Sequence, residues 1–171
     1  SYDRETWFRV DTEYADGTLT IHHMPEADTV WFAYFAPFSM ERHQDLIAWA
    51  QLHHAVELEV IGETLDGQTM DLLTVGEQDS ATRTIWVTAR QHPGETMAEW
   101  WMEGFLGRLL DDDDPVARKL REQAVFHIVP NMNPDGSKRG HLRTNAKGVN
   151  LNREWDKATP ENSPEVFHVL N

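Results

Sequence analysis

The chain has 171 residues, of which 40% are hydrophobic and 10% aromatic, so it has enough apolar side chains for a folded core and is not a disordered segment. Its formal net charge of −14 argues against a general nucleic-acid or anionic-membrane surface, and no stretch reaches the roughly 20 apolar residues of a membrane span. The absence of cysteine excludes a disulfide framework and a thiol nucleophile, so any metal must be bound by histidines and carboxylates. No basic segment followed by an apolar one opens the sequence, and we expect a cytoplasmic location.

Three β-strands are predicted in the first 38 residues, where apolar and β-branched side chains alternate between turn signals. The predicted strands are 7–10, 18–22 and 29–35, with Asp16-Gly17 in the turn between the first two. Three short strands bury too little apolar area to form a stable domain. Residues 1–38 must therefore pack on the remainder of the chain or belong to a domain with further strands.

A helix and a β-hairpin are predicted next. Residues 40–53 carry apolar side chains at helical spacing, and Ser39 stands where an N-cap is expected. Segments 56–64 and 70–75 have strand character and flank Asp66-Gly67, a strong short-range signal for a hairpin turn. The second part of the chain therefore begins with a helix followed by an antiparallel strand pair.

Two apolar, β-branched segments, 84–89 and 124–130, are typical of strands buried on both faces of a sheet. Helices are predicted between them at 96–110 and 115–122, the second with Asp114 as its N-cap. The first of these helices is expected to carry an apolar stripe formed by Met97, Trp101, Phe105 and Leu109. Strand, helices and strand make a βαβ crossover. This predicts an α/β fold with a mainly parallel or mixed sheet and a ligand site beyond the C-terminal ends of its strands.

The end of the first buried strand carries a candidate metal-binding pair, His92 and Glu95. Pro93 favours an extended conformation at His92, Gly94 permits a sharp turn, and Glu95 begins the next helix, so imidazole and carboxylate can converge on one ion. Two ligands leave a catalytic zinc ion incomplete, because such sites use three protein ligands. The pair alone also fits a surface histidine followed by a glutamate that favours a helix N-terminus.

The second strand end is followed by Asn133-Pro134-Asp135-Gly136, predicted to be a turn, and by the most basic part of the chain. Residues 131–157 contain six basic and three acidic residues. Within them, Arg143 and Arg153, with Asn152, offer planar guanidinium groups that bind a carboxylate bidentately and stabilise a developing oxyanion. Judged by charge alone, the segment also fits a solvated loop.

Taken in order, these elements resemble the zinc carboxypeptidase family. They are His92-Pro93-Gly94-Glu95, Asn133-Pro134-Asp135-Gly136, Arg143 and Asn152-Arg153, and the short interval after the second element is similar to the cytosolic carboxypeptidase branch. The resemblance covers residues 39–171. It implies that His92 and Glu95 bind one Zn²⁺ ion, that Arg143 is catalytic because it stabilises the oxyanion, and that Asn152 and Arg153 bind the terminal carboxylate of the substrate.

The resemblance also implies a division of the chain and a set of missing groups. Residues 1–38 resemble the last strands of the β-sandwich that precedes the catalytic domain in this branch, and residues 39–171 the N-terminal half of that α/β catalytic domain. The family's third zinc ligand, a histidine, and its general-base glutamate are expected beyond Asn171. His168 is a poor substitute, because it is predicted near the start of a helix. The fragment alone is therefore expected to be inactive.

The implied activity is removal of the C-terminal residue of a peptide or protein, with acidic tails or side-chain glutamate as the expected substrates of this branch. No nucleic-acid or membrane partner is expected, and the sequence leaves the oligomeric state open. Two alternatives also stay open. One is a zinc amidohydrolase of the aspartoacylase type, which also uses a His-x-x-Glu pair. The other is a non-catalytic module whose arginines bind an acidic C-terminus without a complete zinc site.

Other acidic and histidine residues are expected to be structural. The run Asp111–Asp114 lacks the alternating ligand spacing of a calcium loop and is predicted to be a solvated loop that ends in the Asp114 N-cap. His127, in an apolar strand, is expected to be buried with a hydrogen-bond partner. The histidines expected at the surface or behind other ligands are His22, His23, His53, His54 and His141.

Overall fold

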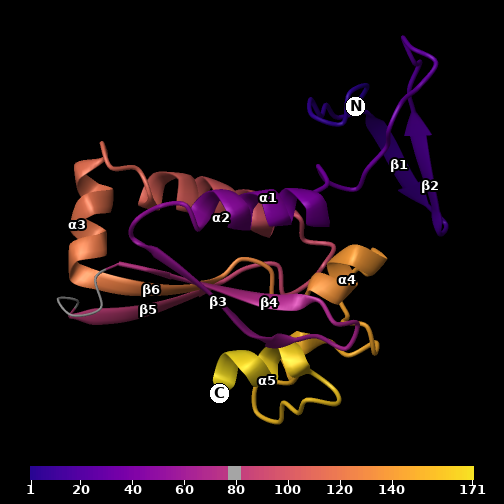
Figure 1. Ribbon diagram of the computed structural model, residues 1–171. Helices are drawn as coiled ribbons and strands as arrows, with labels where there is room; N and C mark the ends of the chain where they lie inside the picture. Colours follow the sequence, from indigo (N-terminus) through magenta and orange to yellow (C-terminus); the bar gives the residue numbers. More distant parts are fainter. Residues whose placement is uncertain (77–81) are drawn as a thin grey trace. The chain divides into compact units, whose positions relative to one another are not determined.

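The computed structural model describes residues 1–76 and 82–171 (Figure 1). Within these ranges the chain divides into two compact units, Ser1–Pro37 and Phe38–Asn171, and each is described by itself below. None of the described helices has the length and apolar character needed to cross a membrane.

The first unit contains an antiparallel pair of strands, β1 (Asp11–Ala15) and β2 (Thr18–His22). Asp16 and Gly17, which join them, have positive φ angles of 50° and 80°. Two successive residues with positive φ are typical of a type I′ turn, whose twist matches that of the two strands it joins. The predicted turn and the predicted second strand are confirmed.

The strands predicted at 7–10 and 29–35 are wrong, because neither segment forms a strand. Near the N-terminus the Asp3 carboxylate accepts hydrogen bonds from the backbone amides two and three residues later. Such local bonds between side chain and backbone compete with a strand ladder. The segment 29–35 is joined to Ser1 by a reciprocal pair of backbone hydrogen bonds at Trp31 rather than by a ladder.

The second unit is built on a four-stranded mixed sheet of order β3-β4-β6-β5. β3 (Val56–Glu63) and β4 (Thr69–Val75) form the predicted antiparallel hairpin, and β4 pairs antiparallel with β6 (Ala124–Val129). β5 (Arg83–Thr88) pairs in parallel with β6. The predicted α/β fold is confirmed, and its sheet is mixed.

Two helices connect β5 to β6, so the predicted βαβ crossover is also confirmed. They are α2 (Met97–Leu109) and α3 (Pro115–Gln123). The side chain of Asp114 accepts from the backbone amides of the first turn of α3, and it is the N-cap that the sequence predicts. A proline at the first helical position fits this start, because its missing N–H has no partner inside the helix.

The remaining helices cover the sheet and its ends. α1 (Met40–Ala50) begins after Ser39, whose hydroxyl accepts from the backbone of Arg42, and it ends three residues earlier than predicted. α1 and α2 lie on one face of the sheet and α5 (Pro164–Leu170) lies on the other (Figure 1). The short helices α4 (Pro134–Arg139) and η1 (Leu151–Arg153) follow β6.

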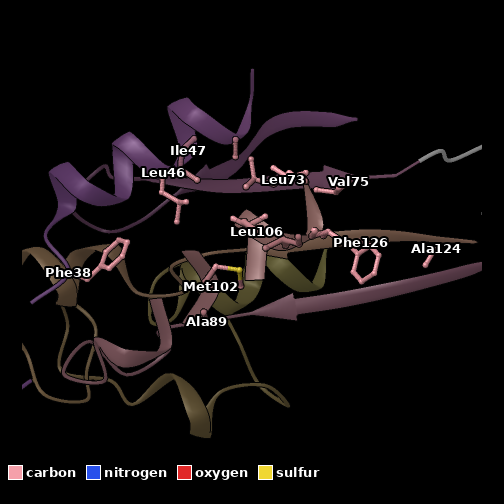
Figure 2. Close-up of a cluster of buried hydrophobic side chains, with 14 residues drawn as sticks. Phe38, Leu46, Ile47, Leu73, Val75, Ala89, Met102, Leu106, Ala124 and Phe126 are labelled. Atoms are coloured by element: carbon pink, nitrogen blue, oxygen red, sulfur yellow. The ribbon is translucent and has the colours of Figure 1, made fainter. Parts of the chain in front are cut away.

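Apolar side chains fill both faces of the central strands. The larger cluster joins α1, α2 and the sheet, and Figure 2 shows it; its members include Phe38, Leu46, Ile47, Leu73, Val75, Met102, Leu106 and Phe126. On the other face a second cluster is formed by Met70, Leu72, Val129, Met132, Leu151 and Val166. Because β4 and β6 are packed on both sides, the loops that leave β6 start from a rigid base.

Two predictions of burial are wrong. β5 lies at the edge of the sheet with β6 as its only hydrogen-bonded neighbour in the described residues, and Trp86 is 50% exposed, so this strand is not buried on both faces. In α2 the buried positions are Glu99, Met102, Leu106 and Leu109, whereas Met97 and Trp101 are exposed. Apolar side chains surround most of α2, and periodicity alone therefore does not identify the face that packs on the sheet.

Candidate metal centre

The segments that leave β5 and β6 stay side by side beyond the two strands. Ala89 donates a backbone hydrogen bond to Val129 at 3.0 Å, and Met132 donates one to Ala89 at 2.9 Å. Because the two strands are parallel, their C-terminal ends lie at the same edge of the sheet. The loop that follows β5 carries His92 and Glu95.

Two glycines let the neighbouring loops approach closely. A Cβ atom on Gly136 would collide with the ring of Pro93 and with the carbonyl of Thr144. One on Gly94 would stand 2.7 Å from Cδ1 of Leu142, whose carbonyl accepts from the Gly94 amide at 3.0 Å. The His-Pro-Gly-Glu and Asn-Pro-Asp-Gly motifs are therefore in direct packing contact.

The segment Asn133-Pro134-Asp135-Gly136 is the start of α4 rather than the isolated turn that was predicted. The Asn133 side chain accepts from the backbone of Gly136 at 3.0 Å and caps the helix. Asp135 is fully buried, and it accepts from the Thr64 hydroxyl and from a backbone amide of the same hairpin loop. This carboxylate therefore fixes α4 to the β3–β4 hairpin and is a structural group.

His92 and Glu95 converge as the sequence predicts. Nδ1 of His92 lies 3.2 Å from each carboxylate oxygen of Glu95; the histidine side chain is 9% exposed and the glutamate side chain 49%. Two ligand atoms bound to one tetrahedral zinc ion at 2.0–2.2 Å stand roughly 3.3 Å apart. The pair thus has the spacing of two zinc ligands and one side open to solvent.

Asn150 is a functional candidate that the sequence reasoning missed. Its Oδ1 lies 3.2 Å from Nε2 of His92, on the far side of the ring from Glu95, and also accepts from the backbone of Asn152, which fixes the orientation of the amide. An acceptor at Nε2 favours the tautomer protonated there and leaves the Nδ1 lone pair facing Glu95. Metal-binding histidines usually have such an outer partner. That rule predicts a hydrogen-bond partner for His92, but the sequence does not identify Asn150 as that partner.

Arg143 is the third predicted residue at this centre. Its Nη2 is 3.2 Å from Nε2 of His92, and its Nη1 is 3.6 Å from Oε1 of Glu95. In the tautomer that donates to Asn150, the contact between Nη2 and Nε2 joins two donors and is not a hydrogen bond. The guanidinium is about half exposed, so its N–H groups can reach a ligand that enters beside the His–Glu pair.

Asn152 and Arg153 follow Asn150 closely in the chain. Both are exposed residues of η1, and the Arg153 guanidinium donates to the Asn152 carbonyl at 2.7 Å. Nε1 of Trp155 donates to the side chain of Gln91 at 2.7 Å, which ties the segment after η1 to the residue before His92. The predicted carboxylate-binding residues therefore lie in a segment that is hydrogen-bonded to the loop carrying His92 and Glu95.

Among the described residues, one group of three side chains that could bind a metal ion lies close together, and it does not include His92 or Glu95. His53, His54 and Asp112 have ligand atoms within 4.8 Å of one another. Nδ1 of His53 accepts from the Ala55 amide, so the neutral ring carries its proton on Nε2 and has no lone pair to offer there. Asp112 already pairs with Arg121. Asp111, Asp112 and Asp113 are exposed in a loop that ends at the Asp114 N-cap, and His54 is exposed, as the sequence predicts. The group is therefore a surface cluster rather than a metal site.

Two other histidines have structural contacts. His168 lies in α5 with its Nε2 3.2 Å from the Glu63 carbonyl. Nδ1 of His127 is 3.1 Å from the Thr74 hydroxyl, and the centroid of its ring lies 4.8 Å from that of Trp86, with the two rings tilted by 36°. As expected, His127 has a hydrogen-bond partner, although it is only partly buried.

A histidine–glutamate pair beside an arginine, at the C-terminal ends of parallel strands, is typical of metal-dependent α/β enzymes. Comparison with known families makes this specific. Residues 44–167 match the zinc carboxypeptidase family, and residues 1–35 match the cytosolic carboxypeptidase N-terminal domain. The chain belongs to the zinc carboxypeptidase family.

Individual relatives agree with this assignment. The chain is 61% identical to an uncharacterized protein of Zymomonas mobilis, with 100% of this chain and 44% of that protein aligned. It is 34% identical to cytosolic carboxypeptidase 1 of Mus musculus, over 89% of this chain and 14% of that protein. The solved structure of a metallo-carboxypeptidase from Pseudomonas aeruginosa, in complex with (2-guanidinoethylmercapto)succinic acid, has a TM-score of 0.95 and 47% identity over 99% of this chain and 45% of that one. The chain thus spans less than half the length of these relatives.

Proposed function

We propose that the longer protein containing this chain is a zinc-dependent carboxypeptidase that hydrolyses the last peptide bond of peptides or proteins. The main observation in support is that Nδ1 of His92 lies 3.2 Å from both carboxylate oxygens of Glu95, in a chain of this family. His92 and Glu95 would hold one zinc ion. The third ligand, a histidine, and the general-base glutamate come from beyond Asn171.

We also propose that the chain contains parts of two domains, with a boundary one residue beyond that of the two compact units. Residues 1–38 form the last strands of an N-terminal β-sandwich, and residues 39–171 form the N-terminal half of the catalytic domain. The match of residues 1–35 to the cytosolic carboxypeptidase N-terminal domain supports this division and a cytoplasmic location. The same match disfavours an amidohydrolase of the aspartoacylase type.

Arg143 would bind the oxyanion that forms during hydrolysis. When bound, the zinc ion supplies a Lewis acid for the scissile carbonyl and lowers the pKa of a water molecule. The Arg143 guanidinium lies next to the proposed zinc ligands, because it contacts both His92 and Glu95. Its N–H groups would donate to the oxygen on which charge develops, and such donors act most strongly in the transition state.

Asn152 and Arg153 would bind the terminal carboxylate of the substrate. Both are exposed, and the Arg153 guanidinium uses Nη1 to donate to the Asn152 carbonyl. Its other N–H groups would donate to the substrate carboxylate. The basic segment 131–157, in a chain of net charge −14, provides the local positive charge that an acidic C-terminus needs. We infer that acidic C-terminal residues, glutamate in particular, are the preferred substrates.

The activity is tested with the longer natural protein and two matched peptides that end in glutamate or alanine, each with a free or an amidated C-terminus. We expect loss of one residue from the free peptides, faster for glutamate, and no reaction with the amidated forms. A chelator should abolish the reaction and zinc should restore it. The 171-residue chain, tested in parallel, should be inactive. Release of internal fragments, or cleavage that persists in chelator, would contradict the proposal.

A further inference from the structure

A buried network of charged groups contacts the loop that carries His92 and Glu95, here called the metal loop. At its centre is Glu99, a fully buried carboxylate in the first turn of α2. Its Oε1 lies 2.6 Å from Nδ1 of His43, and its Oε2 accepts from Nη1 of Arg90 at 2.7 Å and from the side-chain amide of Asn131 at 3.3 Å. On its other side, Nε2 of His43 lies 3.3 Å from Asp71.

The charges of this network balance. Burial lowers the pKa of His43, but hydrogen bonds to Asp71 and Glu99 outweigh it and raise that pKa to about 9, so the ring is cationic at neutral pH. Two cations, His43 and Arg90, therefore face two anions, Glu99 and Asp71. Removing one member would leave a buried charge unpaired, which is strongly destabilising.

Arg90 connects this network to the metal loop. It stands two residues before His92 and has a φ of 47°, which is uncommon for a residue with a side chain. Its Nε donates to the Pro93 carbonyl at 3.0 Å, between the two metal-binding residues, and its Nη1 also donates to the Phe38 carbonyl at 2.7 Å. One guanidinium thus binds the loop, the start of α2 and the segment before α1.

We propose that Arg90 and Glu99 are positioning residues that hold the backbone of the loop carrying His92 and Glu95 in the conformation in which the two side chains bind zinc. This inference rests on the proposed function. The direction of the contacts supports it: the Arg90 fork is directed at the loop carbonyl between the ligands, and Glu99 lies one helical turn after Glu95. The network therefore joins the backbone at Pro93, between the two ligands, to the first turn of the helix that follows Glu95.

Only arginine can make these contacts together. Lysine keeps the positive charge that pairs with Glu99, but it has a single nitrogen and lacks the planar fork that reaches two carbonyls and a carboxylate. The substitution Arg90→Lys therefore keeps the charge balance and removes the geometric link to Pro93. A purely structural role would lower the unfolding temperature and leave the zinc affinity of the folded protein unchanged.

The test measures the zinc dissociation constant of the longer protein by chelator competition at pH 7, at a temperature where circular dichroism shows each variant to be folded. We expect Arg90→Lys to bind zinc 10- to 100-fold more weakly, the loss typical of outer-shell partners of metal ligands. The control is Arg42→Lys. Arg42 lies on α1, and its guanidinium pairs at the surface with Glu103. We expect its affinity to stay within twofold of the wild type.

A second measurement uses metal-free protein. Hydrogen exchange of the Gly94 and Glu95 amides should become faster in Arg90→Lys, while exchange in β6 stays unchanged. If Arg90→Lys does not fold, Glu99→Asp, which keeps the negative charge that pairs with His43 and Arg90 but shortens the side chain, carries the same two expectations. A folded variant with the zinc affinity and loop protection of the wild type would overturn this inference alone. A wild type that binds no zinc would overturn it together with the proposed function.

Discussion

Nε2 of His92 lies 3.2 Å from Oδ1 of Asn150, on the side of the imidazole opposite Glu95. The same Oδ1 accepts from the backbone of Asn152 and caps η1. Asn150 therefore joins two parts of the site: it orients the metal-binding histidine and begins the turn that carries Asn152 and Arg153.

Substitution of Asn150 should weaken zinc binding. Asn150→Ala removes the acceptor at Nε2, and we expect a 10- to 100-fold higher zinc dissociation constant. Asn150→Asp keeps an acceptor at both contacts and should retain affinity close to the wild type. Asn162→Ala, at an exposed asparagine whose side chain accepts from Lys147, is the control. Chelator competition on the longer protein measures all three, and equal losses in Asn150→Ala and Asn162→Ala would exclude the assigned role.

The two arginines should differ in their kinetic effects. Arg143→Ala removes a donor needed chiefly when the oxyanion forms, so we expect kcat to fall by roughly 10²-fold or more. Arg153→Ala should mainly raise KM, because a terminal carboxylate is bound equally in the ground and transition states. Steady-state kinetics with a peptide ending in glutamate separates the two effects. If both variants lose kcat alike and KM stays constant, the assigned carboxylate contact is wrong.

The close packing of the loops that follow β5 and β6 leads to a prediction about stability. Gly136→Ala introduces a Cβ atom that collides with Pro93 and the Thr144 carbonyl, and overpacking of this kind costs roughly 1–3 kcal/mol. Gly107→Ala is the matched control, because a Cβ atom there meets nothing within 4 Å and alanine favours the helix by roughly 1 kcal/mol. Thermal unfolding of the longer protein should show a lower midpoint for Gly136→Ala and a higher one for Gly107→Ala. An unchanged midpoint for Gly136→Ala would contradict the described packing.

Glu165 should make stability depend on pH. Burial raises its pKa to about 7; hydrogen bonds from its own backbone and from Asn145 offset part of the shift, and the charge of Asp135 adds to it. The unfolded chain loses this proton near its ordinary pKa of 4.5, so stability falls as pH rises from 4.5 to 7 and then levels off.

Replacement by glutamine isolates this contribution. Glu165→Gln removes the cost of ionising a buried carboxyl, so the variant should be more stable than the wild type at pH 8, by on the order of 2–3 kcal/mol, and nearly equal to it at pH 4.5. Denaturant unfolding at the two pH values provides the comparison. A stability difference independent of pH would show that Glu165 is already ionised in the folded protein.

Local signals explain which elements could be predicted from the sequence. Ser39, Asp66-Gly67 and Asp114 act within a few residues of themselves, and each marks an element boundary that the structure contains. The buried face of α2 depends on which side meets the sheet. Because apolar residues occur around most of this helix, its buried face was predicted wrongly.

The same distinction holds at the metal centre. His92 and Glu95 are three residues apart, so their convergence follows from local geometry. Asn150 is 58 residues from His92, and Glu99 is 56 residues from His43. Such contacts depend on the tertiary fold, and neither residue type at its position carries a local signal. The residues that the sequence did not predict, Asn150 and Glu99, are therefore those whose contacts join distant parts of the chain.

The most direct test of the central claim is the zinc content of the longer protein, measured by elemental analysis after extensive dialysis, for the wild type, His92→Ala and Glu95→Ala. Both side chains lie in a loop outside the apolar core, so circular dichroism should show the variants to be folded. We predict one zinc ion per wild-type chain and loss of most of it in both variants. Undiminished zinc in the two folded variants would contradict the assignment of His92 and Glu95 as ligands.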